Sequence, residues 1–162
     1  MKELSGFLEA AVAFAATEIA VREHVEKGLS EVAKQIEQTA KDEIGFYQPA
    51  VGPFPAWADL AESTEQDKAR NGYPLNAPLE RTGAMKDSIQ SESEGFEAIV
   101  GSKEETLAFH EFGTVKMPPR PVLGPAVVLN ELKIKRIIGR AAVSGIVGGS
   151  PVHASLGYSR EV

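Results

Sequence analysis

The chain contains three histidines, the side chains best suited to acid–base or metal chemistry near neutral pH. These are His24, His110 and His153, and no spacing typical of a zinc site joins any two of them. Glu111 follows His110 directly, but adjacent residues on a helix point in different directions. We therefore interpret the histidines as structural, and the sequence predicts no metal site.

Motifs for covalent catalysis and for phosphate binding are missing as well. The G-x-S-x-G pattern of serine hydrolases does not occur, and "AVSGIVGGS" (142–150) lacks a strand–turn–helix setting. The glycines of this stretch match neither of the phosphate-cradling loops. Carboxylates are abundant but scattered over helical faces, where they usually form a solvated surface. We expect neither a catalytic residue nor a bound cofactor.

The composition describes an acidic globular protein. The 162 residues are 43% apolar and 25% charged, with no cysteine and a formal net charge of -6 at pH 7. A chain of this length most often folds as one domain that buries about two-thirds of its unfolded surface. The absence of cysteine excludes disulfides and thiolate metal sites. The negative charge argues against a protein that wraps nucleic acid through many phosphate contacts, although it suits a passage through which DNA slides without sticking.

The N-terminal part predicts one long helix over 3–44. Apolar residues recur there every three or four positions: Leu4, Leu8, Val12, Ala15, Ile19, Val25, Leu29, Val32, Ile36 and Ala40. Gly45 ends this pattern, as glycine often follows a helix. The connection over 45–82 is rich in proline and aromatic residues. Within it, Ser63 and Gln66 have the spacing of a capping box that opens a short helix to about Arg70.

A small antiparallel sheet is expected next. The segments "SIQSESE" and "FEAIVGS" flank Glu94–Gly95, which suits a two-residue turn, and so predict a β-hairpin over 88–102. The first strand is almost wholly polar, whereas alternation in the second predicts a buried side through Phe96, Ala98 and Val100. A short helix over 103–112, a loop over 113–124 and a basic helix over 125–144 complete the expected elements.

Together these elements predict an α+β fold, in which the long N-terminal helix and the C-terminal helix pack on the small sheet. We expect a single domain over 1–145. Glycine, serine and proline dominate the chain from Gly145 onward, so 146–162 is predicted to be a tail, or an arm that a neighbouring chain holds.

The most distinctive stretch is "HEFGTVKMPPRPVLGP" (110–125). Three prolines closely surround Arg120, and the residue before each proline is restricted to extended conformations. Such a stiff loop suits a catalytic lid, a docking peptide for a proline-recognition domain or an assembly contact. We favour the contact, because the loop lies between two patterned elements and Arg120 can present its guanidinium at low entropic cost. The candidate interface residues are Phe112, Gly113, Thr114, Lys116, Met117, Pro118, Arg120 and Pro121.

Two blocks of the sequence, "PLERTGAMKDSI" (78–89) and "FHEFGTVKMPPRPVLGPAV" (109–127), resemble the tail-completion, or head–tail joining, family of tailed bacteriophages. Its members are also described as minor tail components or virion morphogenesis proteins. The residues that carry the likeness are Leu79, Arg81, Thr82, Gly83, Ser88 and Ile89 in the first block, and Glu111, Phe112, Gly113, Thr114, Met117, Pro118, Arg120, Pro121 and Pro125 in the second. Many relatives have an aromatic residue where Val122 stands and a basic residue where Gly124 stands.

The resemblance implies a structural protein of a phage or phage-like particle. It implies a homo-oligomeric ring, expected to be a hexamer, that completes the tail and joins it to the head at the neck. DNA would pass through the bore without sequence-specific binding. The implied partners are further copies of the chain, the neighbouring neck or connector proteins, and the tail-tube or terminator proteins. The expected location is the tail or neck of the virion, after assembly in the cytoplasm of the host bacterium and without a membrane.

Other interpretations of the sequence stay open at this point. One is a different neck component, such as a head-closure or tail-terminator ring. The other is a small hydrolase or a nucleic-acid-binding regulator, which would work as a monomer at a defined pocket.

Overall fold

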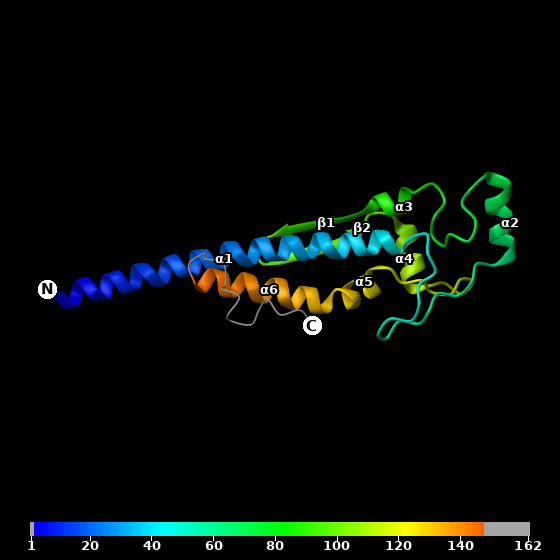
Figure 1. Cartoon of the computed structure of the whole chain (residues 1–162). Coiled ribbons are helices and arrows are strands. Elements are labelled where there is room, and N and C mark those ends of the chain that lie inside the picture. The colour runs from blue at the N-terminus through cyan, green and yellow to red at the C-terminus, as the bar shows by residue number, and fades with distance from the viewer. Residues whose placement is uncertain (1, 148–162) are drawn as a thin grey trace. The chain divides into compact units, whose positions relative to one another are not determined.

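The computed structural model describes the backbone of residues 2–147, and the side chains of residues 11–147 apart from residue 13. Within this range the fold is α+β, as the sequence predicts, with a long N-terminal helix, C-terminal helices and one two-stranded antiparallel sheet (Figure 1). The elements in chain order are α1 (Lys2–Glu43), α2 (Glu62–Asn71), α3 (Ala84–Ser88), β1 (Ile89–Glu94), β2 (Glu97–Ser102), α4 (Glu105–Phe112), α5 (Leu123–Leu129) and α6 (Glu131–Ile146). The predicted tail beyond Val147 lies outside the described residues.

The last helix differs from its prediction. Instead of one helix over 125–144, the chain forms α5 and α6, which Asn130 separates. Asn130 is buried, and its side-chain amide donates to the carbonyl oxygen of Ala126 (2.8 Å) and to Oγ1 of Thr39 on α1 (2.7 Å). Because this amide is held by two helices at once, the backbone leaves the helical path at Asn130 before α6 begins.

Helix α2 lies inside the predicted connection, close to the expected range, but the capping box is wrong. The residue before α2 is Ala61, and no side chain caps the helix there. Gln66 donates instead to the Glu62 carboxylate at 3.2 Å, one turn earlier on the same helix. The local pattern therefore located the helix but not the contacts that begin it.

Contacts within the chain divide it into two compact units, where the sequence predicts one domain over 1–145. Of the described residues, unit 1 contains 2–32, 93–98 and 132–147, and unit 2 contains 33–92 and 99–131. Helix α1 contributes to both: its residues up to Val32 belong to unit 1, and those from Ala33 belong to unit 2.

In unit 1, α6 packs against α1 through small residues. Gly145 lies so close to α1 that a β-carbon on it would stand 2.3 Å from the Cα of Val21. Further along, a β-carbon on Gly28 of α1 would stand 2.9 Å from the Cβ of Ala141. Any larger side chain at Gly145 would push the two helix backbones apart, since packed interiors leave no room for an extra methyl group.

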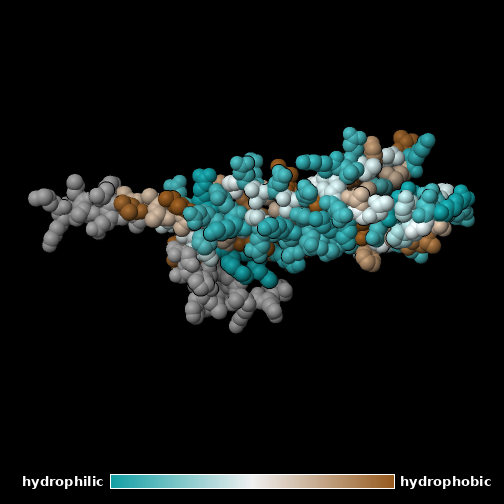
Figure 2. Space-filling view, turned by 90° about the horizontal axis from the view of Figure 1, so that it is seen from above, coloured by the Kyte–Doolittle hydropathy of each residue, from teal (hydrophilic) through white to brown (hydrophobic). Residues whose placement is uncertain are grey.

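The apolar stripe predicted for α1 is exposed in its first part. Val12 and Ile19 of this stripe are largely exposed, as is Phe14 outside it, and Figure 2 shows apolar side chains on α1 directly after the grey N-terminal residues. Later in the helix, Ile36 and Ala40 are buried. The regular spacing predicted the helix correctly, but among the α1 side chains that the structure describes, only those in the second part of the helix are buried.

Unit 2 is built around the end of α1. Its buried apolar residues are Ala33, Ile36, Ala40, Ile44, Trp57, Ala77, Ile89, Leu107, Val122 and Ala126. Ser91 on β1 donates to the carboxylate of Glu37 on α1 at 2.5 Å, and the hydroxyls of Ser88 and Ser102 meet at 2.6 Å at the base of the hairpin. The first contact holds β1 on α1, and the second joins the two ends of the hairpin.

The predicted buried side of the second strand is wrong. Of the three residues predicted to form it, Phe96 and Ala98 are exposed and Val100 is half-buried, and within the two strands only Ile89 is buried. A ribbon of two strands has two solvent-facing edges and no further strand to cover it. Its alternating pattern therefore predicts strand conformation here without predicting burial.

Candidate functional site

The loop between α4 and α5 has a buried stem that Arg120 anchors. The Arg120 side chain is only 5% exposed. Its guanidinium donates from Nε (3.2 Å) and Nη2 (2.9 Å) to the carbonyl oxygen of Ala58, and from Nη2 to that of Asp59 (3.0 Å). Its backbone N–H donates to the carbonyl of His110 at 2.7 Å. The expectation that Arg120 presents its guanidinium to a partner is therefore corrected, because this side chain fastens the loop to residues 58–59.

Glu111 supplies the second anchor of the stem. Its carboxylate accepts hydrogen bonds from the backbone N–H groups of Val122 (2.7 Å), Leu123 (3.2 Å) and Gly124 (3.1 Å). These N–H groups start α5, where a helix has no internal acceptors for its first donors. A carboxylate near the end of α4 therefore caps α5 from a distance, and no pattern in the sequence indicates this role beyond the acidic residue itself.

Pro121 belongs to the stem as well. It is buried, and its carbonyl accepts a hydrogen bond from the indole Nε1–H of the buried Trp57 at 3.1 Å. Pro121 is therefore a packing residue rather than an exposed contact. Trp57 comes from the connection between α1 and α2, so three separate segments of unit 2 meet at this stem.

Gly113 sets the direction of the loop as it leaves α4. Its backbone angles, φ 72° and ψ 178°, lie in a region that almost only glycine adopts. A β-carbon there would stand 2.9 Å from the nitrogen of Pro119 and 3.0 Å from the carbonyl oxygen of Met117. Thr114 and Met117 then pair through two backbone hydrogen bonds of 2.9 and 3.2 Å, which close a tight turn.

The tip of the loop, Phe112 to Pro118, is the exposed part. Phe112 is 83% exposed, and Val115 is fully exposed. Thr114, Lys116 and Pro118 are exposed too, whereas Met117 is half-buried. Val115 was not among the predicted contact residues, although an apolar residue in a turn between glycine and proline was an available signal. The candidate residues thus separate into an exposed tip and a buried stem.

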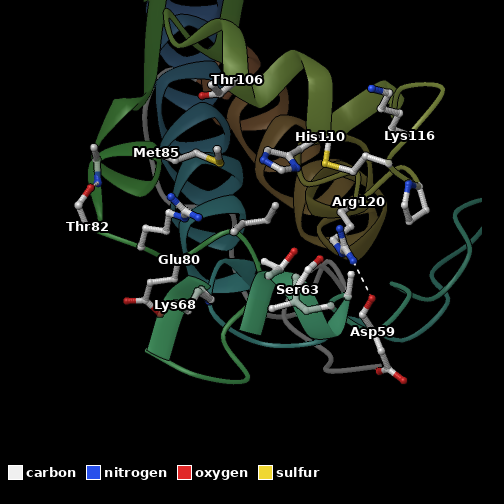
Figure 3. Close-up of a pocket in the computed structure, with 18 of the residues that line it drawn as sticks. Asp59, Ser63, Lys68, Glu80, Thr82, Met85, Thr106, His110, Lys116 and Arg120 are labelled. Atoms are coloured by element: carbon white, nitrogen blue, oxygen red, sulfur yellow. Dashed lines mark hydrogen bonds between the residues drawn. The ribbon is translucent and has the colours of Figure 1, made fainter. Parts of the chain in front are cut away.

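A cavity of about 650 Å³ lies beside the loop. Figure 3 shows its walls: the start of α2 with Ser63, the segment with Thr82 and Met85, Thr106 and His110 of α4, and Lys116 and Arg120 of the loop. Residues 79–85 come from the first block of the resemblance, and residues 110, 116–118 and 120 from the second. The two blocks therefore meet at one place in unit 2.

Burial shifts the ionisation of several groups around this site. Desolvation lowers the pKa of His110, and the charge of Arg120 lowers it further, so the imidazole is neutral near pH 7. Burial also lowers the pKa of Lys68, whose ammonium donates to the carbonyl of Ala77 at 2.5 Å. On α1, burial and the nearby charge of Glu111 raise the pKa of Glu43 to about 8.

The structure describes the positions of two of the three histidines, for which the sequence predicts a structural role. His24 is half-buried in unit 1 and His110 is half-buried in unit 2, while His153 lies outside the described residues. Among the side chains that the structure describes, no three histidines, aspartates or glutamates gather as they would around a metal ion. Within residues 2–147, no helix has both the length and the apolar character that a bilayer crossing requires.

No family model, curated protein or solved structure matches the chain. Its function has to be argued from the residues of the loop, from their geometry and from the resemblance of the two sequence blocks that meet at the cavity.

Proposed function

We propose that this chain is a structural protein of a phage or phage-like particle. In this role it forms a ring, expected to be a hexamer, at the neck, where it completes the tail and joins it to the head. DNA passes through the bore without sequence-specific contacts, and the protein works in the virion after assembly in the bacterial cytoplasm. The role is mechanical and does not depend on catalysis.

The observation that carries this proposal is the contrast between the fixed stem and the exposed tip of the loop. Phe112 and Val115 expose large apolar side chains on a turn whose two ends are fastened by Glu111 and Arg120. A loop that is ordered before binding loses little conformational entropy when it docks. Exposed apolar side chains on such a loop suit a permanent contact with a protein partner.

The proposed contact residues are those of the tip: Phe112, Thr114, Val115, Lys116, Met117 and Pro118. Gly113 shapes the turn, and Arg120 and Pro121 hold the stem, so these three support the contact without making it. The partner of the tip is either the next copy of the chain in the ring or a neighbouring neck or tail-tube protein.

The test is to locate the chain in particles and to measure its own assembly. We expect an antibody against the chain to label the head–tail junction of purified particles in electron micrographs. We also expect purified protein to form large or concentration-dependent species by size-exclusion chromatography with light scattering, alone or with its neck partner. Particles that lack the chain altogether would contradict the proposal. A protein that stays monomeric with every neck and tail protein of its particle would contradict the ring.

A further inference from the structure

One side of α6 faces away from α1, along which this helix runs (Figure 1). Ala141 and Gly145 are buried and mark the side that packs on α1. Positions 132, 136 and 139 lie nearly opposite them, because each residue advances a helix by about 100°. Leu132 is 70% exposed, and the basic residues next to it on this side are exposed as well. We define the outer side of α6 as Leu132, Lys133, Arg136 and Gly139.

The outer side of α6 combines apolar and cationic groups with open space between them. A β-carbon on Gly139 would meet no neighbouring group within 4 Å, so the helix backbone is accessible there. Among the side chains that the structure describes, no carboxylate forms an ion pair with Lys133 or Arg136. A partner that fits this side therefore brings two negative charges and an apolar group that can lie against Gly139.

The turn of the hairpin, which belongs to the same unit, has the matching character. Glu94 ends β1 and Glu97 begins β2, and both are exposed. Phe96 between them is 58% exposed. No cation among the described side chains forms an ion pair with either glutamate. Because a two-residue turn joins the strands, the two like charges occupy directly opposite positions, which is destabilising. We call Glu94, Phe96 and Glu97 the turn surface.

Arg22 of α1 holds the turn surface in place. Its guanidinium lies over the ring of Phe96, 5.4 Å from the ring centroid. The Nε atom of Arg22 is at the same time paired with the carboxylate of Glu26 at 2.9 Å, so the charge of Arg22 already has a partner. A surface that is fixed before binding loses little conformational entropy when it docks.

The charges on the two surfaces have similar spacing. Lys133 and Arg136 are three residues apart on a helix, which places their Cβ atoms about 5–6 Å from each other. Glu94 and Glu97 stand opposite each other in a hairpin, where Cβ atoms lie about 4.5–5.5 Å apart. Two ion pairs can therefore form side by side, and the ring of Phe96 is left to cover Gly139.

The two surfaces of one chain are kept apart by its own helices. The turn contacts α1 at Arg22, whereas α6 packs on α1 at Val21, and consecutive residues of a helix point about 100° apart. The outer side of α6 also lies across the width of that helix from α1, a distance of about 10 Å. Opposite charges on separated surfaces of the same chain match a second copy, because complementary potentials select the partner of an interface.

We propose that the outer side of α6 in one copy binds the turn surface of a second copy. Since the two surfaces differ, each bound copy keeps one of them free for a further neighbour, so copies add head to tail and close into a ring or continue as a filament. As a ring contact this inference rests on the proposed function. Its residues all belong to unit 1 and the loop tip belongs to unit 2, so the two contacts are tested by different substitutions.

The test measures association of the full-length protein by sedimentation velocity. The turn variant carries Glu94→Lys and Glu97→Lys, and the helix variant carries Lys133→Glu and Arg136→Glu. Each variant alone is expected to associate at least about tenfold more weakly than the wild type, because like charges then meet. An equal mixture of the two should associate as the wild type does, since every turn surface then finds a helix side of opposite charge.

Two controls separate the contact from net charge and from folding. The pair Arg70→Glu and Lys103→Glu changes exposed cations of unit 2 and gives the same net charge as the helix variant, so it should associate normally. The pair Glu94→Gln and Glu97→Gln removes the repulsion within the turn and should weaken association severalfold without lowering the unfolding midpoint. Unchanged association of the turn or helix variant would overturn the proposal, as would a mixture that stays dissociated. A wild-type chain that remains monomeric at millimolar concentration would overturn it too.

Other partners and other failures give different results. A DNA duplex that binds the outer side of α6 and displaces the second copy would assign these cations to nucleic acid and overturn the proposal. Association that follows the charge reversals, by a chain that particles lack, would support the contact and contradict the proposed function. Particles labelled at the head–tail junction, combined with association that ignores the reversals, would contradict this contact alone.

Discussion

The tip and the stem of one loop differ in what their side chains do. In the stem, Glu111 and Arg120 are bonded to the backbone of other segments, and Pro121 accepts a hydrogen bond from Trp57. In the tip, Phe112 and Val115 are exposed. The buried stem residues and the exposed tip residues lie only a few positions apart, and the sequence motif does not distinguish them.

The difference shows that a proline-arginine motif can hold the protein's own loop in place as well as bind a partner. From the sequence, a guanidinium between prolines is expected to bind a partner, yet here it donates to the carbonyls of residues 58–59. The residues left for recognition are then those that the stem exposes. Substitutions in the stem should therefore change stability, and substitutions in the tip should change assembly.

Arg120→Ala is expected to have the largest effect on stability. It removes the hydrogen bonds to Ala58 and Asp59 and leaves their carbonyls without these donors, which should lower the free energy of unfolding by about 3 kcal/mol. Denaturant unfolding measures this loss. Lys116→Ala, an exposed neighbour in the same loop, is the control and should leave the unfolding midpoint unchanged. An Arg120→Ala protein with an unchanged free energy of unfolding would show that Arg120 does not anchor the loop and is available to contact a partner.

Glu43→Gln should stabilise the protein in a pH-dependent way. The folded-state pKa of Glu43 is about 8 and its usual value is 4.5, so folding takes up a proton between these values and stability falls as pH rises through this window. The substitution removes that loss. Its gain should be small near pH 5 and reach on the order of 3 kcal/mol above pH 8.

The control for this experiment is Glu37→Gln on the same helix. Hydrogen bonds from Lys41 and Ser91 lower the pKa of Glu37, so its substitution should destabilise the protein at neutral pH, and this loss should fade as pH falls below the usual range of a glutamate. Denaturant unfolding at several pH values compares the two. A Glu43→Gln gain that does not vary with pH would contradict the buried, raised-pKa carboxyl beside Glu111.

Gly113→Ala is expected to cost about 2 kcal/mol, because its backbone region excludes a β-carbon and Pro119 and Met117 crowd the position. Gly101→Ala is the matched control, since Gly101 has open space around it and no left-handed backbone. Thermal unfolding of both variants gives the comparison. Equal melting temperatures would show that the turn at Gly113 adapts more easily than its geometry indicates.

Phe112→Ser and Val115→Ser should have the smallest effect on stability. Both side chains are already exposed, and surface substitutions usually change the free energy of unfolding by less than about 0.5 kcal/mol. Calorimetry of the double variant checks this. A large loss would mean that the tip is packed in the isolated protein and belongs to the stem.

The sequence predicts the fold where local signals decide it. Regular apolar spacing gives α1, and turn residues between polar and alternating segments give the hairpin. Local sequence patterns do not predict a helix boundary that depends on a contact with a residue distant in the sequence. The buried amide of Asn130 divides the last helix through its contact with Thr39, far away in the sequence.

Burial was harder to predict than conformation. The stripe of α1 looks the same at Val12 and Ile19 as at Ile36, yet only the later residue is buried, because spacing shows which face is apolar and not what covers it. The distinctive segment of the sequence connects α4, which ends at Phe112, to α5, which begins at Leu123. Its division into stem and tip could not be read from residue types, since it depends on where residues 57–59 pass.

The most direct test of the proposed role is to measure head–tail joining in particles that carry the double variant Phe112→Ser, Val115→Ser. We expect complete heads and complete tails that stay separate in electron micrographs, while the purified variant keeps its normal unfolding midpoint. Lys103→Gln particles, processed in parallel, should join normally. A normal yield of joined, infectious particles from the double variant would contradict the claim that the exposed tip makes the assembly contact.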